Sequence, residues 1–204
     1  MKNSLLTKSA RCARMQIALL LAALVLVFLL SFSLGRYDVP VGQVVKILIS
    51  RVFPMEASWT KNMEIAVLNV RLPRILLVCM VGCCLAMAGA GYQSVFQNPM
   101  AAPDILGASS GACFGAALAI LLGLGYAVTT ASSFLFGLIA VGLTYLVGRL
   151  SRIRSPLAMV LTGVMVSSLF SAGTSFIKLV ADTNEQLPAI TYWLMGALTS
   201  VRLD

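Results

Sequence analysis

Four stretches of this sequence contain no charged residue, and each is long enough to cross a lipid bilayer. They cover residues 15–35, 75–103, 105–148 and 155–177. About 20 apolar residues in a helix cross the ~30 Å hydrocarbon core of a bilayer, so the third stretch has room for two crossings. Because lipid offers no partners to backbone polar groups, each segment must satisfy its own hydrogen bonds. The sequence therefore predicts an all-α, polytopic membrane bundle of about five transmembrane helices.

The composition argues against a soluble protein. Of the 204 residues, 59% are hydrophobic and 11% are charged, which leaves too little polar surface for a soluble domain. The net charge of +8 raises the possibility of nucleic-acid binding. The basic residues flank the apolar stretches, however, and form no basic stripe interleaved with aromatics. Anionic lipid headgroups account for them better, so we expect contact with membrane lipid and not with nucleic acid.

The first apolar stretch is interpreted as a retained membrane span. A cleaved secretory signal is the alternative, because Ser31 and Ser33 form a small-x-small cleavage motif after the stretch. Signal sequences have apolar cores of about 7–15 residues, however, and this stretch is longer. Four basic residues and no acidic ones precede it, namely Lys2, Lys8, Arg11 and Arg14. Positive charge is retained on the cytoplasmic side, which predicts a cytoplasmic N-terminus.

Alternating the spans across the membrane gives the expected segment order. Residues 1–14 are a cytoplasmic N-terminus, 35–74 an extracytoplasmic segment, 93–104 a cytoplasmic connection, 148–155 a cytoplasmic loop, and 178–204 an extracytoplasmic segment. The spans are predicted at residues 15–34, 75–92, 105–122, 132–147 and 156–177. Within 35–74, residues 39–53 carry apolar side chains at helical spacing, which predicts a short amphipathic helix. The predicted apolar set is Val41, Val44, Val45, Leu48, Ile49 and Val52.

Small residues recur at intervals of four in two predicted spans. Such spacing lets helix backbones approach closely in lipid. Ordinary packing within the chain is the favoured interpretation, and a gating seam between helices is the alternative. The two sets are Gly82, Ala86 and Ala90, and Gly111, Gly115 and Ala119.

The sequence contains no pattern expected of an enzyme or of a self-powered carrier. There is no Gly-Lys pair and hence no P-loop for ATP. No Asp, Glu, Lys, Arg or His lies in the middle of a predicted span, whereas proton relays and many ion-coupled carriers depend on such a residue. Cys79, Cys83 and Cys84 are interpreted as small packing residues, because the sequence has no histidine to complete a metal site. We therefore expect no catalytic residue, cofactor or metal, and an energy source on another subunit.

Arg71 and Arg74 are the candidate binding residues. Their i, i+3 spacing places both guanidinium groups on one helical face before the second span, with Pro73 suited to the first turn of that helix. Arginine binds carboxylates through its planar fork, which suggests a receptor for an acidic partner. Anchoring in lipid headgroups explains the same residues, and spacing alone favours that alternative.

Several motifs in register from about residue 68 to residue 198 resemble the FecCD family, the permeases of ABC importers for iron–siderophore complexes, haem and vitamin B12. The resemblance begins with Arg71-Leu72-Pro73-Arg74 before a glycine-rich span. The other motifs are Gln97-Asn98-Pro99-Met100-Ala101, Pro103-Asp104-Ile105-Leu106-Gly107, Ser155-Pro156-Leu157, Leu161-x-Gly163-Val164 and Tyr192-Trp193-Leu194-Met195-Gly196.

The resemblance implies a permease of ten helices in a prokaryotic plasma or inner membrane. Such a permease pairs with a second copy or a homologue, with a cytoplasmic ABC ATPase, and with an extracytoplasmic substrate-binding protein. It implies that Arg71 and Arg74 meet acidic residues of that binding protein. It places Arg154, Ser155 and Pro156 near a cytoplasmic gate, and Asn98, Pro99, Pro103 and Gly107 in the motif of the inner connection. The chain is expected to stop before the sixth helix.

The leading interpretation is thus part of an importer permease for ferric siderophore-type chelates. Vitamin B12 or haem is the alternative substrate class. Two other functions stay open, a membrane scaffold whose spans only bind partner helices and a sodium-coupled carrier. Charge reversal at Arg71 and Arg74 should weaken binding-protein docking if the chain is a permease and have little effect if it is a scaffold. Uptake that persists without ATP while the ion gradient is held would identify the carrier.

Overall fold

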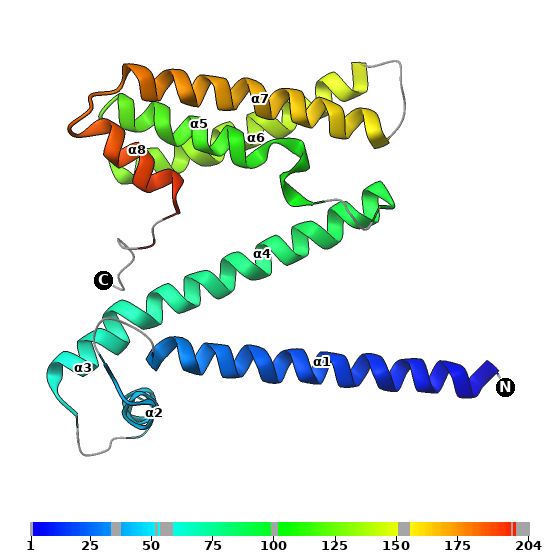
Figure 1. The fold of residues 1–204 in the computed structure, drawn as a ribbon, viewed down its shortest axis with the longest axis vertical. Coiled ribbons are helices and arrows are strands. Elements are labelled where there is room, and N and C mark those ends of the chain that lie inside the picture. Colours follow the sequence, from blue (N-terminus) through cyan, green and yellow to red (C-terminus); the bar gives the residue numbers. More distant parts are fainter. Residues whose placement is uncertain are drawn as a thin grey trace. The chain divides into compact units, whose positions relative to one another are not determined.

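The computed structural model describes residues 2–33, 38–51, 53, 59–98, 102–150, 156–196 and 198. Every regular element in these ranges is a helix, as Figure 1 shows, which confirms the all-α prediction. The chain divides into two compact units, which separate between Val81 and Gly82. The helices are α1 (Lys2–Ser33), α2 (Val41–Ser50), α3 (Lys61–Ile65), the π-helix η1 (Ala66–Arg71), α4 (Leu72–Phe96), the 3₁₀ helix η2 (Pro103–Leu106), α5 (Ala108–Leu121), α6 (Tyr126–Leu150), α7 (Pro156–Val180) and α8 (Gln186–Leu194).

Four helical segments of the described chain are long and apolar enough to cross a membrane. They are Ala13–Phe32, Lys61–Phe96, Tyr126–Leu150 and Ala158–Val180. They overlap the predicted spans at 15–34, 75–92, 132–147 and 156–177. Lys61–Phe96 and Tyr126–Leu150 extend beyond the predicted spans 75–92 and 132–147 at both ends, because a helix can continue past the point where its sequence becomes polar.

The predicted third span, residues 105–122, has a different form. Gly107 interrupts it with a left-handed backbone, φ 77°, so that η2 ends before α5 begins. The 14 residues of α5 rise about 21 Å at ~1.5 Å per residue, less than the ~30 Å of a hydrocarbon core. This segment is a short apolar helix with a 3₁₀ turn before it, and not a regular span of 18 residues.

The first unit is held together by a cluster of apolar side chains from the end of α1, from α2 and from η1. Val44 and Ile47 of α2 are buried in it beside Phe32, which confirms a short helix within 39–53. The predicted apolar face of α2 is only partly right. Val41, Val45 and Ile49 are exposed, while Ile47, absent from the predicted set, is fully buried.

Pro73 lies inside a continuous helix of 36 residues, Lys61–Phe96, and not in a first turn. A proline in a helix removes one donor and clashes with the carbonyl four residues earlier. The chain relieves this by widening to a π-helix immediately before the proline, where the Leu72 N–H bonds to the Val67 carbonyl five residues back. A π turn accommodates the ring without breaking the helix.

The second unit is built around α5, which packs against α6 and α7 (Figure 1). Phe114 of α5 joins all three helices, with its ring 5.2 Å from Phe136 of α6 and 5.5 Å from Phe170 of α7. Gly111 and Gly115 are buried against α6, where an added Cβ would lie 2.5 Å from a backbone oxygen. The predicted packing of small residues is therefore confirmed for α5.

The other set of small residues does not pack within the described chain. Ala86 and Ala90 of α4 are exposed, and no atom lies within 4 Å of a Cβ built on Gly82. For this helix, packing of the small residues within the chain stays a prediction.

Candidate functional site

Arg71 and Arg74 lie one turn apart on the long helix, and both are partly buried. The Arg71 guanidinium donates through Nη1 to the backbone carbonyl of Phe32, in the last turn of α1. The last four carbonyls of a helix lack partners within it, and a cation near a helix C-terminus is favoured by the helix dipole. Arg71 thus serves a contact inside the first unit, which the spacing did not predict. Binding-protein docking by either arginine stays a prediction.

The inner connection is fixed to two helices of the second unit. Thr144 of α6, which is fully buried, donates through Oγ1 to the Leu106 carbonyl at 3.0 Å. Gly163 of α7 lies so close to Ile105 that an added Cβ would be 1.9 Å from the Ile105 oxygen. The 3₁₀ turn is therefore held between α6 and α7 through its own backbone.

Glycine is required at position 107 for two reasons. Its φ of 77° lies in the left-handed region that side chains disfavour, and an added Cβ would be 2.8 Å from Oγ of Ser167. The backbone reversal here ends η2 and begins α5, whose Gly111 N–H bonds to the Gly107 carbonyl at 3.0 Å. The motif residues Gly107 and Gly163 thus meet in one contact between the inner connection and α7.

The other predicted motif residues do not join this contact in the described chain. Asn98 is exposed just after the end of α4, next to Gln97, whose φ is 50°. Pro103 opens η2. Pro99 lies outside the described residues, as do Arg154 and Ser155 of the predicted gate neighbourhood. Pro156 is the first residue of α7, consistent with the preference of proline for that position.

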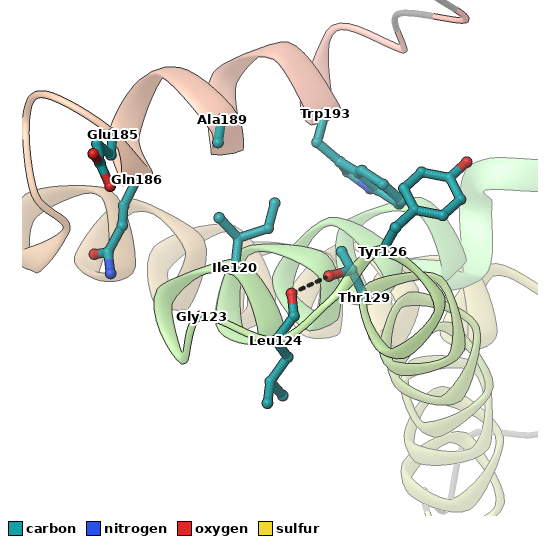
Figure 2. A pocket seen from close by; sticks show the side chains of 9 residues that line it. All are labelled: Ile120, Gly123, Leu124, Tyr126, Thr129, Glu185, Gln186, Ala189 and Trp193. Carbon is teal, nitrogen blue, oxygen red and sulfur yellow. Dashed lines mark hydrogen bonds between the residues drawn. The ribbon is translucent and has the colours of Figure 1, made fainter. Parts of the chain in front are cut away.

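An open pocket of about 440 Å³ lies between α8 and the turn that joins α5 to α6. Figure 2 shows Tyr126 and Trp193 together at one end, with Glu185 and Gln186 at the other. The two rings meet edge to face at 5.4 Å. The Gln186 amide donates to the Leu121 carbonyl at 3.1 Å and its oxygen accepts from the Asp182 N–H at 3.1 Å. These contacts fix both ends of α8 above the turn.

Sequence reasoning missed Thr144 and Gln186, which make these inter-helix contacts. A hydroxyl in the middle of an otherwise apolar helix is the available signal for Thr144, since a polar group in lipid seeks a partner. Thr129 and Thr130 near the start of α6 also carry hydroxyls, and only contacts in three dimensions separate them from Thr144. Nothing in the sequence marks Gln186 as a contact residue, because it lies in a polar segment in which a glutamine is expected.

We predict that Thr144→Val lowers the stability of the second unit by about 1 kcal/mol, because valine has a similar shape but cannot donate to Leu106. Thermal unfolding of the detergent-purified chain measures the change, and hydrogen exchange of residues 103–110 locates it. Thr130→Val is the matched control, since Thr130 is exposed and donates to a carbonyl of its own helix, that of Tyr126. Equal losses in the two variants would contradict the prediction.

The fold and these contacts define a helical, multi-pass membrane protein. The FecCD transport family model matches residues 23–204, so the chain belongs to that family. It is 37% identical over 177 residues to the molybdate import system permease protein MolB of Haemophilus influenzae, covering 87% of this chain and 52% of MolB. It is 36% identical over 155 residues to the cobalamin import system permease protein BtuC of Halobacterium salinarum, covering 76% of this chain and 42% of that protein.

A solved structure supports the family assignment. It is described as an inward-facing conformation of a metal-chelate type ABC transporter, and it matches with a TM-score of 0.70 and 34% identity. The match covers 88% of this chain and 52% of that one. The chain spans about half the length of the relatives it matches.

Proposed function

We propose that this chain forms part of the transmembrane permease of an ABC importer, in which ATP hydrolysed by a separate subunit moves substrate inward. The observation that carries the proposal is the family match over residues 23–204. The packing supports it, because α5, α6 and α7 form a closely packed core while α1 and α4 expose nearly all their apolar surface. Such surface needs lipid or further helices to cover it.

The proposed partners follow from this role. A second permease copy or a homologue completes the transmembrane part, a cytoplasmic ABC ATPase supplies energy, and an extracytoplasmic binding protein delivers the substrate. The N-terminus is placed in the cytoplasm of a prokaryotic cell, since basic residues gather before the first span. This orientation puts the Arg71–Arg74 turn on the extracytoplasmic side, where a binding protein would dock.

The proposed substrate is a ferric chelate of the siderophore type. Support comes from the metal-chelate type of the solved relative and from the Pro103–Gly107 motif. MolB and BtuC carry molybdate and cobalamin in their names, which makes these the two rival substrates. Apolar spans offer few hydrogen-bonding groups to tell such molecules apart, so selectivity is assigned to the binding protein.

Co-purification tests the importer. The chain is expressed in its own membrane, extracted in mild detergent, and its bound proteins are identified. We expect an ABC ATPase and a binding protein among them. Recovery of neither from a well-folded chain would overturn the importer and favour the scaffold alternative.

Uptake by vesicles that contain the recovered complex tests the substrate. Iron-55 desferrioxamine, cyanocobalamin and molybdate are supplied in turn, with and without ATP. ATP-dependent uptake of the iron chelate alone supports the proposal, and uptake of another compound in its place overturns the siderophore assignment. Uptake that persists without ATP while a sodium gradient is held would identify a sodium-coupled carrier.

A further inference from the structure

The contact between Arg71 and the end of α1 points to a role for this arginine that needs no partner protein. Its guanidinium reaches 39 residues back along the chain to the Phe32 carbonyl. Phe32 itself is fully buried in the cluster that includes Val67 and Leu68 of η1. The arginine therefore lies at the margin of an apolar core, where a hydrogen bond is shielded from water.

Arg71 faces α1 together with the buried part of η1. Val67 and Leu68 lie four and three residues before it, and residues three or four apart share one face of a helix. Arg71, the last residue of η1, thus reaches the carbonyl end of α1 while Val67 and Leu68 stay in the core. A π turn holds an extra residue, so it rotates the residues after it by about 100° relative to those before it, compared with a regular helix. Pro73 favours this register, as described above. Pro73, the π turn and Arg71 thus all belong to the short segment that contacts the end of α1.

We propose that Arg71 is a positioning residue, which clamps the C-terminal turn of α1 to the helix Lys61–Phe96. The clamp fixes the rotation of that helix about its axis, and hence the direction in which Arg74 is presented three residues later. The two arginines then have different tasks, although their spacing made them equivalent. This inference goes beyond the proposed function, because the clamp operates in the chain without a binding protein.

Hydrogen exchange of the full chain in lipid nanodiscs tests the clamp. In Arg71→Met, amides of residues 29–33 are expected to exchange about five-fold faster, since the last turn of α1 loses a hydrogen bond that holds it. Amides of α5–α7 are expected to be unchanged. Arg74→Met is the matched control, because it removes the same charge one turn later, and it should leave residues 29–33 unchanged.

Two further variants complete the test. Arg71→Lys keeps a cationic donor on a long stem and is expected to restore slow exchange at residues 29–33, which a loss of guanidinium packing alone would not explain. If Arg71→Met does not fold, Arg71→Gln takes its place, with the same selective acceleration expected. Unaltered exchange in a folded Arg71 variant, or equal acceleration in Arg74→Met, would overturn the clamp.

Discussion

Replacing Gly163 by alanine is expected to destabilise the second unit by about 3 kcal/mol or more, and to prevent much of the chain from folding in the membrane. The added Cβ would lie 1.9 Å from the Ile105 oxygen and 3.2 Å from the Leu106 Cα. Both are backbone atoms, so no side-chain rotation can relieve the clash. Overpacking of a helix contact costs about 1–3 kcal/mol even where neighbours can move, and here α7 would have to separate from η2.

The measurement is the folded fraction after extraction in mild detergent, read as the monodisperse peak in size-exclusion chromatography, with the thermal midpoint of that peak. Gly142→Ala is the matched control. Gly142 lies in α6 with no atom within 4 Å of an added Cβ, so alanine there should leave the midpoint unchanged or raise it by its better helix propensity. A Gly163→Ala chain as stable as the control would mean that the contact with η2 is not required for folding.

This contact marks where prediction from sequence succeeded and where it stopped. The motif placed Gly163 in a helix, and α7 contains it. It placed Gly107 at the connection before the third span, and Gly107 lies between η2 and α5. Charge-free stretches predicted the long helices, because a charged side chain in lipid is energetically costly and membrane-spanning segments therefore lack charges. That argument locates apolar segments, but it does not show which glycines contact the backbone of another segment.

Two elements departed from prediction in their backbone geometry. A charge-free stretch predicts one span at 105–122, yet the left-handed backbone at Gly107 divides it into η2 and α5. Proline at position 73 suggests a helix start, yet the π-helix lets the helix pass through it. At Gly107 the turn is held by neighbours distant in sequence, Thr144 and Gly163. Before Pro73 the π turn accommodates the proline ring, and Arg71 at its end bonds to the distant Phe32 carbonyl. Periodicity and composition carry no information about such contacts.

Reversing the charge at Arg74 is the prediction with the largest expected effect on partner binding. If the turn that carries Arg74 meets carboxylates of a binding protein, Arg74→Glu replaces an attraction by a repulsion next to a partly buried site. Loss of one partner of a close charge pair at an interface costs about 2–5 kcal/mol. We therefore expect the affinity for the binding protein to fall about 100-fold or more, since each 1.4 kcal/mol is a factor of ten.

The affinity is measured between the nanodisc-embedded complex and the binding protein recovered with it, over a range of salt concentrations. The wild-type affinity should decrease with salt, and that of Arg74→Glu should depend on salt less or in the opposite sense. Arg149→Glu is the control, because Arg149 is exposed near the end of α6 that the predicted topology places in the cytoplasm. It changes the net charge equally, so a similar loss in both variants would indicate a long-range field and not a docking contact. If neither variant loses affinity, Arg74 has no part in docking, and anchoring in lipid headgroups becomes the better explanation for the residue.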